Sequence, residues 1–391
     1  MPAVLFYVQH LLGIGHLMRA RVIAEALADA GCDVHLVSGG RPFGGRLPRG
    51  VRTVQLPPIH ATDAGMKPLR DVEGHPIDDT YRERRRRLLI AEFDSVAPAA
   101  VIFETFPFGR RALHFELLPL LERIEAARPR PLVVASVRDI LQQRRNPERE
   151  REMLALARRA FDAILVHGDS RFVRLDATFP LAPELGMPVR YTGFVTASDA
   201  RTSAPEEGAR SEVIVSTGGG AVGSALLRTA IEARGRSRFS AAPWRVLVGS
   251  NASKDELERL TRDAGRGVII EPARADFPAL LARASISVSQ AGYNTVLDVV
   301  HSGARPVLVP YAEHGETEQR MRAKRLRELD LAVVVDEPET SVAALASAID
   351  AAGSKEDWGR WNFDCDGAAR TATIIMEMLQ RNRAPRVGIH Q

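Results

Sequence analysis

The sequence predicts an α/β protein made of two domains, each a doubly wound parallel sheet. Short apolar runs of strand length alternate with segments of helical spacing along nearly the whole chain, and residues 196–211 break this alternation once. A glycine-containing loop follows the first predicted strand on each side of that break, at 13–15 and at 218–220. With 391 residues, the chain is long for a single hydrophobic core and comfortable for two.

The first domain is predicted at residues 1–195. It opens with an apolar run at 4–8, a glycine loop, and a helix in which apolar residues keep helical spacing from Ala20 onwards. The loop is not a dinucleotide-binding fingerprint, because Met18 stands where the third glycine belongs. Further strands are predicted at 34–37, 51–55, 99–103, 132–135, 163–167 and 189–192.

Residues 196–211 are the predicted linker, since they combine Ser, Ala, Pro, Gly and charged residues without periodicity. The second domain is predicted at 212–366, and a C-terminal segment at 367–391 contains a helix near 368–379. Open α/β sheets bind ligands at the carboxyl ends of their strands, so each domain is expected to carry one binding region. In the second domain, strands are predicted at 213–216, 244–248, 268–270, 286–289, 306–309 and 332–335, and helices at 255–264 and 341–351.

Composition excludes several classes of protein. Apolar residues make up 45% of the chain and charged residues 26%, which is typical of a globular protein. No run approaches the roughly 18 apolar residues of a membrane span, and no basic segment precedes the short apolar run at the N-terminus, so neither a transmembrane helix nor a signal peptide is expected. Two cysteines, Cys32 and Cys365, are too few for a disulfide framework or a zinc site, which favours a cytoplasmic location.

The segment 288–323 is the part of the chain most informative about function. Gly292 allows a sharp turn after a buried strand, and Asn294 or Thr295 is expected to cap the helix that follows, whose N-terminus suits a diphosphate. Asp298, in the first turns of that helix, can accept hydrogen bonds from ribose hydroxyls. Glu318 and Gln319 follow the next strand and are suited to a sugar. In series, these sites predict a nucleotide-sugar pocket.

This segment resembles the donor-binding signature of the family 28 glycosyltransferases, whose best-known member adds N-acetylglucosamine to a lipid-linked precursor. The resemblance implies a GT-B fold, two Rossmann-like domains that face each other across a cleft, and inversion of the anomeric centre. Gly292, Asn294, Thr295, Asp298 and Gln319 match the signature by position, and Tyr293 lies within it. Asp298 replaces a glutamate, and Glu318 replaces the first glutamine of a Gln-Gln pair, which leaves the identity of the sugar open.

Two more loops of the second domain match the same family. The consecutive glycines Gly218, Gly219 and Gly220 correspond to a turn beside the donor phosphates, where their backbone amides can form an anion-binding nest. The stretch that contains Ala273 and Arg274 corresponds to the loop that reads the nucleotide base through backbone atoms. A tight strand–helix turn is the alternative interpretation of the glycines.

In the first domain, the loop with Gly13, Gly15 and His16 resembles the family's G-x-G-H loop, whose histidine lies near the acceptor. A histidine has a pKa near neutrality and is a natural general base for a hydroxyl, although a capping or packing role is the alternative. Glu104 ends a predicted strand and can orient His16, bind the acceptor or act as the base itself. Arg138 follows another strand and is predicted either to bind the acceptor or to form an ion pair with Asp139.

These features predict an inverting glycosyltransferase that transfers a sugar from a nucleotide-diphosphate donor, expected to be a UDP-sugar, to an acceptor hydroxyl. Nearly the whole chain is similar to a group of predicted bacterial glycosyltransferases. No D-x-D motif is present, so neither a metal nor a separate cofactor is expected. The alternatives are a nucleotide-sugar 2-epimerase on the same fold and a protein that binds nucleotide sugars without catalysis.

A basic run bears on the partners. Five arginines lie within residues 82–87, and spread charge of this kind usually belongs to a solvated helix face. The functional alternatives are attraction to a lipid-linked or phosphate-bearing acceptor, or peripheral contact with the inner face of an anionic membrane. Nucleic acid is not expected as a partner, because no aromatic residues interleave with the arginines.

Overall fold

The computed structural model divides the chain into two compact units. The first comprises Met1–Val195 and Phe363–Gln391, and the second comprises Thr196–Asn362. Most of the predicted linker lies outside the described residues. The structure describes residues 1–61, 68–143, 146–196, 210–217, 223–249, 252, 254–274, 276–336 and 339–383.

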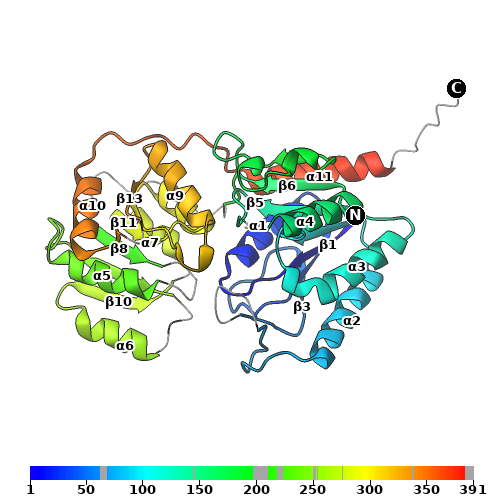
Figure 1. Ribbon diagram of the computed structural model, residues 1–391, viewed down its shortest axis with the longest axis horizontal. Helices are drawn as coiled ribbons and strands as arrows, with labels where there is room; N and C mark the ends of the chain where they lie inside the picture. The colour runs from blue at the N-terminus through cyan, green and yellow to red at the C-terminus, as the bar shows by residue number, and fades with distance from the viewer. Residues whose placement is uncertain are drawn as a thin grey trace. The chain divides into compact units, whose positions relative to one another are not determined.

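The first unit is built on a seven-stranded parallel sheet with the strand order β3-β2-β1-β4-β5-β6-β7 (Figure 1). Its inner strands are apolar and buried on both faces, as expected where helices cover both sides of a parallel sheet. The strand order reverses direction between β1 and β4, which is the switch point at which such sheets bind ligands. The strands are β1 (Ala3–Val8), β2 (Asp33–Ser38), β3 (Val51–Gln55), β4 (Ala100–Glu104), β5 (Leu132–Arg138), β6 (Ala163–His167) and β7 (Val189–Tyr191).

Five helices cover the two faces of this sheet. Alternate residues of β1 separate the two cores: Leu5 and Tyr7 pack with α2, α3 and α4, whereas Phe6 and Val8 pack with α1 and α11. The last helix, drawn in red in Figure 1, thereby packs against the first, α1. The helices are α1 (Gly15–Asp29), α2 (Asp79–Val96), α3 (His114–Ala126), α4 (Pro147–Ala160) and α11 (Gly367–Arg383), with a 3₁₀ turn η1 (Arg111–Leu113) before α3.

The boundary at the C-terminal side differs from the prediction. Residues 363–366 were predicted to belong to the second domain, but they pack within the first unit. The ring of Phe363 makes edge-on contacts with those of Phe172 and Phe194, and the backbone N–H of Phe194 donates to the carbonyl of Asp364 at 2.7 Å. The change of unit therefore falls at Asn362.

The basic run lies on α2 and is not uniformly solvated. Arg85 is fully buried and forms a two-pronged ion pair with Glu116 of α3, at 2.8 Å for both contacts, while the hydroxyl of Tyr7 donates to the same carboxylate at 2.6 Å. These buried, charge-assisted hydrogen bonds link α2 and α3 to β1 at the centre of the sheet. Arg82 and Arg86 form partly exposed ion pairs within α2. No helix among the described residues has the length and apolar character needed to cross a bilayer.

The second unit repeats the same design with six parallel strands in the order β10-β9-β8-β11-β12-β13 (Figure 1). Its switch point lies between β8 and β11. One face packs against α5, α6 and α10, and the other against α7 and α8. The strands are β8 (Glu212–Ser216), β9 (Trp244–Val248), β10 (Val268–Pro272), β11 (Ala284–Ser289), β12 (Arg305–Leu308) and β13 (Val333–Val334). The helices are α5 (Ser224–Arg234), α6 (Lys254–Asp263), α7 (Phe277–Ala282), α8 (Tyr293–Ser302), α9 (Glu318–Glu328) and α10 (Val342–Ser354), with the turn η5 (Glu313–Gly315). Two units of this design confirm the predicted α/β class.

Candidate functional site

His16 and Glu104 meet at the switch point of the first unit. His16 lies in the first turn of α1, directly after the glycine loop that follows β1, and Glu104 is the last residue of β4. Nδ1 of His16 lies 2.9 Å from Oε1 of Glu104 although the two residues are 88 positions apart in sequence. The histidine side chain is 14% exposed, whereas the Glu104 side chain is fully buried. Only the histidine can therefore meet a ligand.

Glu104 is ionised in this setting. Burial alone would raise the pKa of its carboxyl, but the adjacent Arg19 guanidinium, His16 and the hydroxyl of Ser136 outweigh burial and hold this pKa well below the usual range. Arg19 is itself buried and donates to Oε1, and Ser136 donates to Oε2 at 2.7 Å. Glu104 and Ser136 lie on neighbouring strands near the carboxyl edge of the sheet, and His16 and Arg19 lie in the first two turns of α1.

His16 is neutral, with a defined tautomer. Burial lowers the pKa of its imidazole well below the ordinary value, and the positive charges of Arg110 and Arg138 lower it further, against the effect of Glu104. An ionised carboxylate can only accept hydrogen bonds, so the proton of the neutral ring belongs on Nδ1, facing Glu104. Nε2 is then an unprotonated acceptor. This is the arrangement of a general base with an orienting carboxylate.

A second layer of polar groups holds the carboxylate. The Ser136 hydroxyl lies 2.8 Å from Nε2 of His167, whose Nδ1 lies 2.9 Å from the hydroxyl of Thr192. Burial lowers the pKa of His167 to about 3, so this ring is neutral and passes hydrogen bonds without adding charge. The chain of contacts fixes the position of Glu104 and, through it, of His16.

The loop after β4 carries backbone strain beside the histidine. Thr105 has φ of 71°, a costly conformation for a β-branched residue, and its hydroxyl lies 3.2 Å from Nδ1 of His16. Arg110 has φ of 65°. Of the predicted acceptor residues, Arg138 ends β5 on the same edge, while Gly13 and Gly15 belong to the loop and first helical residue before His16.

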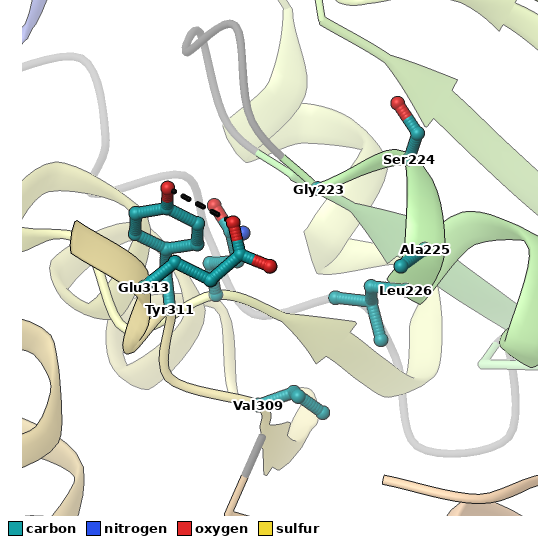
Figure 2. Close-up of a pocket in the computed structure, with 8 residues that line it drawn as sticks. Gly223, Ser224, Ala225, Leu226, Val309, Tyr311 and Glu313 are labelled. Carbon is teal, nitrogen blue, oxygen red and sulfur yellow. Dashed lines mark hydrogen bonds between the residues drawn. The ribbon is translucent and has the colours of Figure 1, made fainter. Parts of the chain in front are cut away.

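The second unit contains a pocket of about 210 Å³ at its own switch point. Its walls come from the start of α5 on one side and from the segment after β12 on the other, where the hydroxyl of Tyr311 lies 3.5 Å from a carboxylate oxygen of Glu313 (Figure 2). Gln290, directly after β11, completes the lining. The full lining is Gly223, Ser224, Ala225, Leu226, Gln290, Val309, Tyr311 and Glu313.

The N-terminus of α8 is not capped as predicted. The helix begins at Tyr293 with Gly292 as its N-cap, so Asn294 and Thr295 lie inside the first turn, and no side chain hydrogen-bonds to the cap. A Cβ on Gly292 would meet only the hydroxyl of Thr295, at 3.7 Å, so neither packing nor φ requires glycine there. The N-terminus of α8 is not capped by a side chain, and its N-cap residue is a glycine, so an anion can approach the backbone there closely.

Asp298 lies one turn further along α8, and no hydrogen bond to a described residue satisfies its carboxyl group. Burial raises the pKa of this group to about 7. A carboxyl group that is costly to ionise and makes no ion pair is suited to accept hydrogen bonds from a ligand, which agrees with the predicted contact to ribose hydroxyls.

The predicted sugar-binding pair has two different environments. The side chain of Gln319 contacts the segment after β12 that lines the pocket, where its Oε1 accepts a hydrogen bond from the backbone N–H of Tyr311 at 3.2 Å. Glu318 is buried and ion-paired at 2.8 Å with Arg322, which donates to the carbonyl of Ala291 at 2.8 Å. Glu318 therefore holds the turn before α8, and direct contact with a sugar, as predicted, does not fit its burial.

The remaining donor residues are only partly placed. Ala273 donates its backbone N–H to the carbonyl of Val248 at 2.7 Å, and Arg274 forms ion pairs with Glu271 and Asp276. The Arg274 side chain is thus engaged within its own loop. The glycines 218–220 lie outside the described residues.

Several residues of both sites escaped the sequence analysis. Arg19 stands one helical turn after His16, which was a usable signal, and Arg322 stands four residues after Glu318, which is the spacing of an ion pair on a helix. Others come from distant elements and leave no local pattern. These are Arg110, Ser136, His167, Gln290, Tyr311 and Glu313.

One cluster among the described residues has the composition of a metal site. Ligand atoms of Asp71, Glu73 and His75 lie within 4.8 Å of one another on an exposed turn of the first unit. The Asp71 carboxylate already accepts the backbone N–H groups of Glu73 and His75, at 3.0 and 2.9 Å. The turn accounts for the cluster without a metal.

Comparisons with known proteins agree with this geometry. Residues 213–358 match the Glycosyltransferase family 28 C-terminal domain. The fold is similar to that of MurG from Acinetobacter baumannii, with a TM-score of 0.55 at 14% identity over 97% of this chain and all of that one. It is also similar to that of Arabidopsis thaliana UGT89C1 complexed with UDP, with a TM-score of 0.66 at 12% identity over 97% of this chain and all of that one. The second unit is thus similar to the family 28 C-terminal domain, and the chain as a whole has the GT-B fold.

A curated relative carries a similar sequence over a shorter stretch. The UDP-N-acetylglucosamine–N-acetylmuramyl-(pentapeptide) pyrophosphoryl-undecaprenol N-acetylglucosamine transferase of Desulfotalea psychrophila is 27% identical over 145 residues. The match spans 35% of this chain and 39% of the relative. The likeness in sequence is therefore confined to less than half of either protein.

The environment of Asp298 predicts a pH-dependent change in stability. Its folded pKa, about 7, lies above the unfolded value of about 4. The folded state then binds more protons between these values, so the carboxyl group favours folding at low pH and opposes it as the pH rises through 7. Asp298→Asn should raise the melting temperature at pH 8 and leave it nearly unchanged at pH 4. Glu271→Gln is the control: this carboxylate, on the edge strand β10 of the same unit, is ion-paired, so its replacement should show no such rise.

Proposed function

We propose that this protein is an inverting glycosyltransferase that transfers a sugar from a UDP-sugar to an acceptor hydroxyl. The observation that carries the proposal is the neutral His16 ring held by the ionised Glu104 carboxylate at a ligand-binding edge of a GT-B protein. The family 28 match at 213–358 supports a nucleotide-sugar donor in the second unit. The structural neighbour complexed with UDP supports uridine as the nucleoside.

In the proposed reaction His16 is the base and Glu104 orients it. Nε2 of His16 removes the proton of the acceptor hydroxyl while that oxygen attacks the anomeric carbon from the face opposite the diphosphate. The bond between the anomeric carbon and the diphosphate oxygen breaks, and UDP leaves with the electron pair. Glu104 stabilises the imidazolium that forms and keeps Nδ1 protonated. Its full burial argues against Glu104 as the base itself.

The second unit supplies the proposed donor contacts. The uncapped N-terminus of α8, at Gly292, meets the diphosphate and stabilises the charge that develops on the leaving group. Asp298 accepts hydrogen bonds from the ribose. The pocket beside Gln290 and Tyr311 holds the sugar, and Gln319 fixes the segment that carries Tyr311.

The acceptor and the cellular location are further parts of the proposal. The name of the curated relative includes a pyrophosphoryl-undecaprenol, which supports a lipid-linked acceptor for this chain as well. An acceptor of that kind would require contact with a membrane surface from the cytoplasmic side. The partly exposed arginines of α2 supply the positive charge for that contact.

A product analysis separates the proposed activity from its alternatives. The protein is incubated with UDP-N-acetylglucosamine and UDP-glucose, and the nucleotide products are resolved by chromatography. Release of UDP that depends on an added acceptor supports transfer. Appearance of an epimerised nucleotide sugar would instead indicate an epimerase, and binding without any product would indicate a sensor; either result would contradict the proposal.

Loss of the base should slow the chemical step alone. His16→Ala is expected to lower kcat by about 10²–10⁴-fold and to leave the Kd for UDP nearly unchanged, because the nucleotide contacts belong to the other unit. Because the pKa of His16 lies well below 6.5, wild-type kcat at a saturating UDP-sugar concentration should stay level from pH 8 down to pH 6.5 and fall only below it. A His16→Ala enzyme with normal kcat would remove His16 from the mechanism.

We propose that transfer does not depend on a divalent metal, since the helix end at Gly292 supplies positive potential to the diphosphate. Turnover should persist in excess EDTA. Loss of activity under EDTA that Mg²⁺ or Mn²⁺ restores would contradict this part of the proposal.

A further inference from the structure

Four adjacent strands of the first unit end in a row of buried polar side chains. The row consists of Glu104 at the end of β4, Ser136 on β5, His167 at the end of β6 and Thr192 directly after β7. The register of these strands places the row on one face of the sheet, because side chains alternate between faces along a strand. All four residues are buried, so their polar groups need hydrogen-bond partners within the protein.

The hydrophobic core does not account for this row. Two residues earlier on three of the same strands, Ile102, Val134 and Leu165 belong to the apolar core that packs against α1. The polar row replaces that apolar pattern only at the carboxyl edge, where Nδ1 of His16 lies 2.9 Å from Oε1 of Glu104. The position of the row therefore indicates a role at His16 rather than in packing.

The hydrogen-bond protons of the row can be arranged in two ways. The Ser136 hydroxyl has a single proton and two neighbours, Oε2 of Glu104 at 2.7 Å and Nε2 of His167 at 2.8 Å. The Thr192 hydroxyl lies 2.9 Å from Nδ1 of His167 and also reaches two backbone carbonyls, the nearer at 2.9 Å. A neutral imidazole carries one N–H, so the placement of one proton in the row determines the others.

The charge of Glu104 selects one of these arrangements. Ser136 donates to the carboxylate rather than to the imidazole, because a charge-assisted hydrogen bond is roughly twice as strong as a neutral one. Nε2 of His167 must then donate to the Ser136 oxygen, and its bare Nδ1 accepts the proton of Thr192. Burial lowers the pKa of His167 to about 3, which keeps this ring neutral. In the reverse arrangement, Ser136 would donate to His167, and Oε2 of Glu104 would lose that donor.

We propose that Ser136 is a positioning residue for the His16 base, and that His167, as its Nε2–H tautomer, keeps the Ser136 hydroxyl directed at Glu104. By holding Oε2 of Glu104, Ser136 leaves Oε1 directed at Nδ1 of His16. Its hydrogen bond also stabilises the carboxylate charge, so Glu104 attracts an imidazolium less strongly and His16 more readily stays neutral. The effect on turnover rests on the proposed function, whereas the protonation of the two histidines does not.

The tautomer of His167 tests the direction of the chain in the wild-type protein. Its ring nitrogens are observed by nitrogen-15 NMR and assigned through their bonds to the labelled backbone, so no variant has to fold. At pH 7 and without ligand, we expect the proton on Nε2 and a bare Nδ1. A proton on Nδ1 would mean that Ser136 donates to His167 instead of Glu104, and would overturn the proposal.

Ser136→Ala tests the positioning role. The variant should lower kcat about tenfold or more, as loss of a hydrogen bond to a charged group predicts, and should leave the Kd for UDP unchanged. It should also raise the pKa of His16, followed by NMR without substrate, because the carboxylate of Glu104 loses a competing donor. A residue that only packs against its neighbours would affect the melting temperature but not this pKa.

Thr178→Val is the matched control. Thr178 has another buried hydroxyl of the first unit, and its bond to the carbonyl of Leu175 lies outside the row. Its replacement should leave kcat and the pKa of His16 unchanged. Equal effects of the two variants, or an unchanged His16 pKa in Ser136→Ala, would overturn the proposal. If the wild type transfers no sugar while Ser136→Ala alone raises this pKa, the proposed function fails and the contribution of Ser136 to His16 stands.

Discussion

The arrangement of the site in the first unit depends on the contacts of one buried carboxylate, that of Glu104. A carboxylate without solvent must be paired or protonated, and here Arg19, His16 and Ser136 together keep it ionised. Its charge then determines which nitrogen of His16 carries the proton. The parallel sheet makes this possible, because the strands β4 and β5 and the loop after β1 all end at one edge. A small shift of the Glu104 carboxylate would therefore also shift the imidazole ring of His16 and its Nε2 atom.

The second unit meets a different physical problem with the same topology. The proposed ligand, a nucleotide diphosphate, needs positive potential, and α8 offers it at an N-terminus that no side chain caps. Arg322 holds the turn before that end through the carbonyl of Ala291, and Glu318 holds Arg322. The charged residues here support the backbone, whereas Glu104 and Arg19 of the first unit support the side chain of His16. Each unit thus has polar groups at its switch point. In the first unit they position a side chain, and in the second they position the backbone before a helix.

Much of the fold was predictable, because each central strand is buried on both faces and therefore appears in the sequence as an uninterrupted apolar run. The observed bounds of β4, for example, differ from the predicted bounds by one residue. The sequence also named His16, Glu104 and Asp298 as candidate site residues, and the structure places the first two in contact. The helix cap was predicted wrongly, because Gly292 is the N-cap and the helix starts one residue before Asn294. Direct contact of Glu318 with a sugar was predicted because a polar residue after a strand was expected to be exposed, whereas Glu318 is buried and ion-paired. Arg110 and His167 could not be assigned, since only the folded sheet brings them near Glu104.

The tautomer and charge of His16 test the central claim most directly. Nitrogen-15 NMR of labelled imidazole rings distinguishes a protonated Nδ1 from a protonated Nε2, and the His16 signal can be assigned by its absence in a His16→Gln variant. The account predicts, at pH 7 and without ligand, a neutral ring with the proton on Nδ1, and protonation of Nε2 only well below pH 6.5. A ring with its proton on Nε2, or one that is already cationic at pH 7, would contradict the assignment of His16 as the base.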